Sequence, residues 1–386
     1  MKVKIFASMV LTWLAATTIA HAQDAYVIGM STALTGPGAS TVAGAAEGLK
    51  LYIDRLNKAG GVNGRKVNLI IQDDQGEPSK AAANAKKLLS DNVSLLINTS
   101  ISSTFAPMIA EAKRANVPLL FAGSVCPPDV YPPANEFLFC TTSFSAAHDA
   151  RATIDFIKQK SGTDIKLGLA AMAIPVSRAG IDAAEKFATA TAMKVTGKEV
   201  IPPATADYTP FATKLMQESP DWVYCWAPWV TEVKTFDALR KLGWKGPYAL
   251  NVLPETEGEL AQIKDDKLYA VGTNAMFFEN LPVQKEIAEV AKSASSNYQP
   301  NQMADGWIGG IAIEAILKKA GWPANADGVK NAMSNLEIDT KGLRGGPIVW
   351  TKDNHFRTKQ YYRVYRWDGA KNAVIVDMDW KSYDIQ

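Results

Sequence analysis

The sequence predicts the α/β fold class, with two doubly wound parallel-sheet lobes. Short apolar segments alternate with segments of helical periodicity at the spacing of β-α-β units, which indicates parallel strands with helices on both faces. The same alternation restarts near residue 150. The chain of 386 residues is also too long for one small core, which favours two domains.

The first half of the chain alternates between predicted strands and helices. A loop rich in Gly, Ser and Pro follows the first strand. The first helix ends at Gly60-Gly61, because glycine commonly follows the last residue of a helix. Ser79 is a suitable N-cap for the second helix. The predicted strands span residues 26–30, 67–71, 93–97 and 117–121, and the predicted helices span 43–59, 79–90 and 104–116.

The second half repeats this pattern. Its predicted helices span residues 150–160, 180–193, 211–218 and 231–242, and its strands span 166–172, 194–201, 222–226 and 248–252. Doubly wound sheets bind ligands at the carboxyl ends of their strands. The candidate site is therefore formed by the loops that follow strands, at residues 31–40, 98–103, 122–126, 173–178, 227–230 and 253–257.

The N-terminus has the pattern of a secretory signal peptide. Lys2 and Lys4 precede an uncharged segment at 5–19, and Ala20-His21-Ala22 forms an A-x-A cleavage site. We expect export, cleavage after Ala22 and a periplasmic mature chain. A membrane anchor is the alternative, but the apolar run is shorter than the roughly 20 residues that a span needs. No later run is long enough, so we expect no integral membrane segment in the mature chain.

Charge and cysteine content narrow the class further. The formal charge is +2, and loss of Lys2 and Lys4 with the leader leaves a neutral chain, which argues against nucleic acid as a partner. Cys126 and Cys140 flank a Pro-rich stretch, and export favours a disulfide between them over two buried thiols. Cys225 is in a predicted strand and is expected in the core.

Catalytic and cofactor-binding motifs are missing from the sequence. There is no H-E-x-x-H, G-x-S-x-G or G-x-x-x-x-G-K-[ST] motif, and no Cys/His cluster suggests a metal. We therefore expect no cofactor, no metal and no enzyme activity. A secreted hydrolase built from scattered Ser, His and Asp stays open as an alternative.

Several motifs resemble the branched-chain amino-acid-binding proteins of ABC transporters. Residues 54–65 fit D-x-x-N-x-A-G-G-V-N-G-[RK], a highly specific pattern of that family, and residues 28–37, 73–74, 102–104 and 345–350 support it. The resemblance implies a type I periplasmic binding fold, with a three-segment hinge and a small ligand held between its lobes. It places lobe 1 at 24–143 plus 273–359 and lobe 2 at 144–272 plus 360–386. The implied partner is an ABC transporter permease in the inner membrane.

The same resemblance assigns ligand-binding residues. It implies that a ligand carboxylate is held by Ser102 and Ser103 and by a loop formed by Gly123, Ser124 and Val125. The family's Tyr-Gly pair, near the ammonium group of an amino acid, is replaced here by residues that include Ile174 and Val176. By our alignment, Asn251 or Val252 stands where the family has an acid, and Glu255 or Glu257 is the open alternative.

The remaining predicted site residues describe the shape of the pocket. Thr41 is small where the family often has an aromatic ring, whereas Phe144, Trp226 and Trp229 add aromatic surface and Arg178 a cation. These features favour an aromatic carboxylate of the benzoate or phenylpropenoate type. A branched-chain or other apolar amino acid, with Glu255 or Glu257 at its ammonium group, is the alternative. A sensor-coupled receptor with the same fold is a further one.

Overall fold

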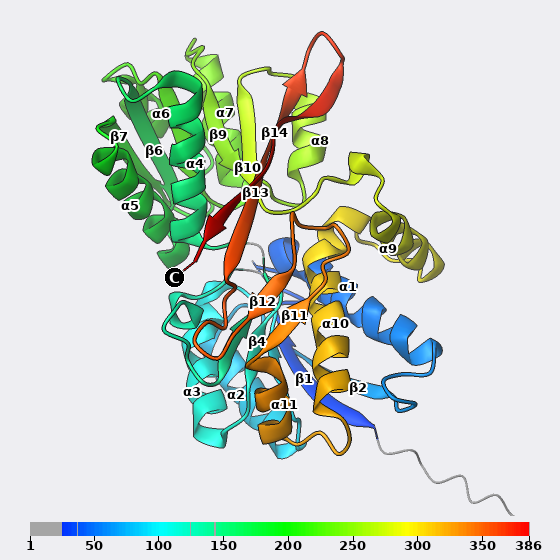
Figure 1. Cartoon of the computed structure of the whole chain (residues 1–386). Coiled ribbons are helices and arrows are strands. Elements are labelled where there is room, and N and C mark those ends of the chain that lie inside the picture. The colour runs from blue at the N-terminus through cyan, green and yellow to red at the C-terminus, as the bar shows by residue number, and fades with distance from the viewer. Residues whose placement is uncertain (1–24, 37, 124, 143, 386) are drawn as a thin grey trace, which may run out of the picture.

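A computed structural model describes residues 25–385, except residues 37, 124 and 143. The predicted signal peptide at 1–22 lies outside these residues. Figure 1 shows two lobes, one above the other, each built around its own sheet. The α/β fold with two sheets that the sequence predicts is confirmed. No helix among the described residues is long and apolar enough to cross a membrane.

The first lobe contains a five-stranded parallel sheet with the order β2-β1-β3-β4-β5. Strands β1, β3, β4 and β5 are buried on both faces, because α2 and α3 cover one face and α1 and α10 cover the other, whereas the edge strand β2 is mostly half-buried. The strands are β1 (Tyr26–Thr32), β2 (Val67–Asp73), β3 (Leu96–Asn98), β4 (Leu119–Phe121) and β5 (Leu138–Cys140). The helices are α1 (Ala39–Lys58), α2 (Pro78–Ser90), α3 (Phe105–Ala115) and α10 (Pro300–Ala320), with the 3-10 turns η1 (Ser102–Thr104) and η2 (Pro128–Val130).

Glycines allow α1 and α10 to pack with their backbones in close contact. A Cβ added to Gly306 would lie 1.7 Å from the carbonyl oxygen of Ala45, and one added to Gly48 would lie 2.3 Å from that of Met303. Only glycine fits at such a close backbone approach. This contact places the start of α1 beside the start of α10, where both helices border the space between the lobes.

The second lobe contains a seven-stranded sheet with the order β14-β13-β10-β9-β8-β6-β7. The strands β6 to β10 are parallel, but β13 and β14 form an antiparallel hairpin at one edge, so this sheet is mixed. The strands are β6 (Lys166–Met172), β7 (Lys194–Ile201), β8 (Trp222–Trp226), β9 (Tyr248–Asn251), β10 (Leu268–Gly272), β13 (Lys359–Asp368) and β14 (Ala373–Asp384). The helices are α4 (Ala146–Ser161), α5 (Pro175–Ala190), α6 (Thr209–Met216), α7 (Trp229–Lys241) and α8 (Thr256–Ile263).

The chain passes between the two sheets three times, as Figure 1 shows. The first passage leads from β5 to α4, the second from β10 to η3 (Phe277–Glu279), and the third from β12 (Ile348–Trp350) to β13. Between the second and third passages lie α9 (Pro282–Ser293), α10, α11 (Ala326–Met333) and β11 (Leu336–Ile338). The hinge therefore has three segments, in agreement with the fold class implied by the sequence motifs.

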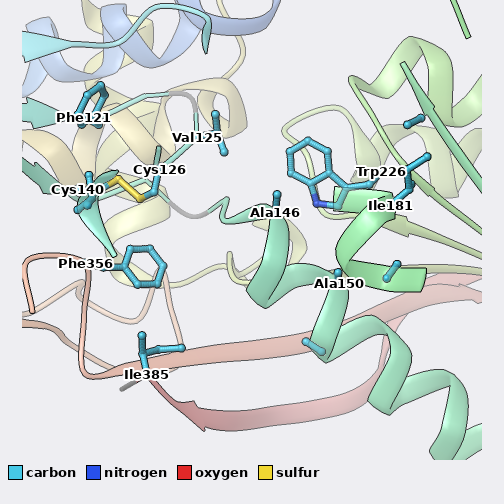
Figure 2. Packing of buried hydrophobic residues seen from close by; sticks show 14 of the residues in the cluster. Phe121, Val125, Cys126, Cys140, Ala146, Ala150, Ile181, Trp226, Phe356 and Ile385 are labelled. Atoms are coloured by element: carbon cyan, nitrogen blue, oxygen red, sulfur yellow. A yellow bond between two sulfur atoms is a disulfide. The ribbon is translucent and has the colours of Figure 1, made fainter. Parts of the chain in front are cut away.

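The first and third passages are bound to each other near a disulfide. Cys126 and Cys140 are joined, with their Cα atoms 5.9 Å apart, and Cys225 is a buried free thiol. Nε1 of Trp350 donates to the carbonyl oxygens of Cys140 (3.3 Å) and Phe356 (3.1 Å). Figure 2 shows Phe356 beside the disulfide, within an apolar cluster that continues into the second lobe. The hinge region is thus a packed structure.

Candidate ligand-binding site

A cavity of about 160 Å³ lies between the lobes, at the carboxyl ends of the parallel strands. Residues from both lobes line it, as expected for the loops that follow strands. An engineered apolar cavity of about 150 Å³ can hold benzene, so this space suits a molecule with one ring or one branched aliphatic chain.

Most of the predicted site residues are brought together here. The cavity is lined by Thr41, Ser102, Gly123, Val125, Phe144, Ile174, Val176, Trp226, Trp229 and Asn251. Ser103 is exposed instead, and its hydroxyl donates to the carbonyl oxygen of Gly76 (2.8 Å). Arg178 is exposed and does not line the cavity, because it follows Ser177 on α5 and successive helical residues point about 100° apart. Ser124 lies outside the described residues.

Sequence reasoning missed one part of the wall. Residues 274–277 of the second passage and residues 301, 302, 304 and 305 of α10 also line the cavity. Residues 274–277 follow β10, a parallel strand that the sequence analysis did not predict, and the residues of α10 follow no strand. The only available signal was the hinge implied by the family resemblance, which sends the chain past the cleft a second time.

The first-lobe wall offers hydrogen-bond donors. Ser102 opens η1, which continues directly into α3, so its hydroxyl lies at the positive end of a helix. The preceding loop is held by a hydrogen bond from the backbone N–H of Ser100 to Oδ1 of Asn98 (2.9 Å) and by one from Nδ2 of Asn98 to Oγ1 of Thr104 (3.0 Å). This wall suits a carboxylate.

Aromatic side chains form the second-lobe wall. Trp226 ends β8, and Figure 2 shows its ring facing toward Val125 of the first lobe, with Ala146 nearby. Nε1 of Trp226 donates to Oδ2 of the buried Asp149 (3.3 Å), which fixes the orientation of the indole. Only 6% of Trp226 is exposed, so it belongs to the core as well as to the cavity. Trp229 and Phe144 are half-buried and extend this apolar surface.

The charged residues of the wall are all acids. Glu255, Glu257 and Asp305 line the cavity, and no Lys, Arg or His stands among its lining residues in the described chain. Oδ1 of Asp305 lies 2.7 Å from Nη2 of Arg344, so a buried cation already balances this carboxylate. Oε2 of Glu257 accepts the backbone N–H of Phe277 (2.6 Å) and thereby holds the second passage.

Glu255 resembles Glu257 and differs from Asp305, because neither glutamate is paired with a cation of the described chain. It forms no ion pair with the described part of the chain, and burial raises the pKa of its carboxyl, although Gln302 acts in the opposite direction. Burial likewise raises the pKa of Glu257. A partly buried carboxylate without a cation is a favourable place for a positively charged group of a ligand.

Asn251 has a supporting role. Its Nδ2 donates to Oε1 of the buried Glu232 (2.8 Å), and its backbone N–H donates to the same oxygen (3.2 Å). The acid next to this strand end is thus Glu232, which lies behind Asn251, and residue 251 itself is an amide. Further along the chain, Glu255 and Glu257 are the acids of this segment that line the cavity.

A serine and a histidine lie in contact elsewhere, but not as an active site. Oγ of Ser145 and Nδ1 of His148 are 2.6 Å apart. Ser145 is fully buried and neither residue lines the cavity, so no substrate reaches this pair. His355, the other histidine of the described chain, is also absent from the cavity wall.

Comparison with known proteins identifies the family. The sequence profile described as "Periplasmic binding protein" matches residues 25–372. The chain belongs to this family. Periplasmic binding proteins bind ligands and are not enzymes, which agrees with a ligand-sized cavity between two lobes.

Individual relatives of this periplasmic binding protein are distant. The Leu/Ile/Val-binding protein BraC3 of Rhizobium johnstonii is 22% identical over 384 residues, which cover 96% of this chain and 99% of that one. A branched-chain amino acid ABC transporter protein from Thermus thermophilus with bound valine has a TM-score of 0.78 at 17% identity, covering 93% and 97% of the two chains. A solute-binding protein from R. palustris in complex with benzoate has a TM-score of 0.75 at 20% identity, covering 92% and 96%. These two structures share the fold.

Proposed function

We propose that this periplasmic binding protein binds an apolar α-amino acid of the leucine, isoleucine or valine type and delivers it to the permease of an ABC transporter. The observation that carries the proposal is the charge of the cavity wall. Glu255 is a partly buried acid without a paired cation, and no cationic side chain of the described wall competes for it. A ligand ammonium group supplies the missing charge.

Each part of such a ligand has a counterpart in the cavity. Ser102 and the start of the η1–α3 segment suit the carboxylate, and Glu255 suits the ammonium group. Val125, Phe144 and Trp226 provide apolar surface for the side chain. Burying roughly 100 Å² of aliphatic surface contributes about 2–3 kcal/mol, and the charged contacts supply direction.

The amino-acid alternative is better supported than the aromatic carboxylate that the sequence favoured. A benzoate-like ligand brings only negative charge, and with Arg178 outside the cavity it would meet Glu255 without a compensating cation. A relative that matches over 99% of its length is named a Leu/Ile/Val-binding protein. A benzoate-bound protein of the same fold and the aromatic wall of Trp226 and Trp229 keep an aromatic acid as the second candidate.

The proposal includes export and closure. The mature chain would begin after Ala22 and act in the periplasm, as the predicted leader indicates. The lobes would comprise residues 24–143 plus 273–359 and residues 144–272 plus 360–386. A ligand that contacts both lobes binds the closed state better than the open one and so shifts the population toward closure.

The test compares two charge-neutralising variants by calorimetry on ligand-stripped mature protein. Glu255→Gln should weaken leucine binding at least about 30-fold, because loss of one partner of a buried charge pair costs about 2–5 kcal/mol. Glu259→Gln removes the same charge from α8 at a position outside the cavity wall and should change the affinity little. Wild-type protein that binds benzoate and not leucine or valine would refute the proposal.

A further inference from the structure

A second, much smaller cavity lies where the third passage enters β13. Its volume is about 10 Å³, which is room for roughly one water molecule or one small ion. Arg344, Arg357 and Lys359 border it, and no acidic residue does so in the described chain. The cavity is separate from the ligand-binding cavity, with which it shares no lining residue.

Arg357 is a buried cation with an incomplete set of partners. Only 1% of the residue is exposed. Its Nη1 donates to Oε1 of Gln360 (2.6 Å), its Nη2 donates to the carbonyl oxygen of Thr142, and its guanidinium lies 4.2 Å from the ring centre of Phe356. Its Nε is buried and has no acceptor among the described residues, and no carboxylate there forms an ion pair with it.

Arg344 is the second buried cation at this cavity. Its Nη2 pairs with Asp305 (2.7 Å) and its Nε donates to Oδ1 of Asn274 (3.2 Å). Its Nη1 is buried and lacks an acceptor within the described chain. Burial lowers the pKa of Arg357, and the positive charge of Arg344 lowers it further, to about 9.

The nearby anions are already engaged. Asp149 attracts Arg357 at longer range, but its own oxygens accept the backbone N–H of Ser145 (2.9 Å), the hydroxyl of Tyr362 (2.7 Å) and Nε1 of Trp226 (3.3 Å). Asp305 is paired with Arg344. A buried guanidinium without a paired anion is costly, and so is a buried N–H without an acceptor.

We propose that this cavity is a binding site for one monoatomic anion with the chemistry of chloride. Nη1 of Arg344 and Nε of Arg357 donate to the ion, and Lys359, which pairs with Asp384 (3.9 Å), lies at the rim. The ion neutralises the repulsion between the two guanidinium groups and thereby stabilises the third passage. Because Arg344 also holds Asp305 and Asn274, which line the ligand-binding cavity, the anion fixes part of that wall. This inference does not depend on the identity of the organic ligand.

The first experiment measures unfolding of the full mature protein in sodium gluconate, with chloride or bromide replacing gluconate at constant ionic strength. Gluconate is too large for the cavity. The unfolding midpoint should rise and saturate with halide, and at ten times its dissociation constant the halide should increase the folding equilibrium constant about 11-fold. Arg357→Gln should abolish the halide dependence. The matched control Arg151→Gln, which removes an exposed arginine near the hinge, should retain it.

The second experiment uses wild-type protein alone, so it remains decisive if Arg357→Gln does not fold. Crystals grown with sodium bromide should show an anomalous peak between the guanidinium groups of Arg344 and Arg357. A water molecule at that position without anomalous signal would overturn the proposal. So would a midpoint that responds equally to gluconate and halide.

Discussion

The contact between α1 and α10 gives a direct prediction about how packing positions the cavity. In Gly306→Ala, the new Cβ would lie 1.7 Å from the carbonyl oxygen of Ala45 and 2.8 Å from the backbone N of Leu49. Both atoms belong to the α1 backbone, so no flexible side chain can move aside. Heavy atoms in good contact are about 3.5–4.0 Å apart, which means that the helices must separate by more than about 1 Å.

The expected cost is at or above the upper end of the roughly 1–3 kcal/mol that overpacking usually costs. For a lobe of this size, about 3 kcal/mol lowers the unfolding midpoint by roughly 6–12 °C. Ligand affinity should fall as well, because Thr41 and Ala45 of α1 and Gln302 and Asp305 of α10 line the cavity. Differential scanning calorimetry and titration with leucine measure the two effects.

Gly258→Ala is the matched control. Gly258 lies in α8, and a Cβ added there meets no atom within 4 Å. Alanine is the better helix former by about 0.5–1 kcal/mol, so this variant should be as stable as wild type or more stable. A Gly306→Ala variant with a midpoint within 1 °C of wild type, by the same measurement, would refute the packing argument.

Three further predictions concern titration and cross-linking. Leucine affinity should fall as the pH is lowered, and the fall should begin above the pH range in which glutamate ordinarily titrates, because burial raises the pKa of Glu255. The affinity of Glu255→Gln for leucine should not show this fall. A parallel fall in both proteins would contradict the prediction. Cys126 and Cys140 are 14 residues apart, and reduction of their disulfide should lower the free energy of unfolding by about 3 kcal/mol. Denaturant titration with and without reductant measures this change. Burial lowers the pKa of His148 from 6.5 to about 4, so between these pH values the unfolded chain binds a proton that the folded chain does not. The free energy of unfolding should therefore fall by an amount on the order of 3 kcal/mol as the pH is lowered from 6.5 toward 4. His148→Gln should remove this dependence of the free energy of unfolding on pH. Burial raises the pKa of Asp149 to about 6, so Asp149 contributes a dependence of opposite sign that the variant keeps. An unchanged pH profile would show that His148 is not the titrating group.

The alternation of strands and helices could be predicted because it depends on local hydrophobic periodicity. The strand at 166–172 has the bounds of β6, and the strand at 222–226 those of β8. The strand predicted at 93–97 instead begins at Leu96, although Val93 and Leu95 are buried. The apolar residues at 93–97 predict a buried segment. Where the strand begins depends on its pairing with β1, and the sequence pattern does not show which strands are neighbours.

The candidate site was predictable where it follows strands and less so elsewhere. Trp226 and Val125 end up across the cavity from each other because carboxyl ends of parallel strands meet at one edge of each sheet. Arg178, predicted for the cleft, does not line the cavity, since the direction of its side chain depends on where α5 begins. The contribution of α10 depends on its packing against α1, which is far away in the sequence, and no local pattern predicts that contact.

Calorimetry with a matched pair of ligands tests the central claim, that a carboxylate of the cavity wall holds an ammonium group. Leucine and 4-methylpentanoate have the same carboxylate and the same branched chain, and only leucine carries the ammonium group. The account predicts that ligand-stripped wild-type protein binds leucine at least about 30-fold more tightly, and that Glu255→Gln narrows this difference. Equal affinity for the two ligands, or tighter binding of 4-methylpentanoate, would contradict it.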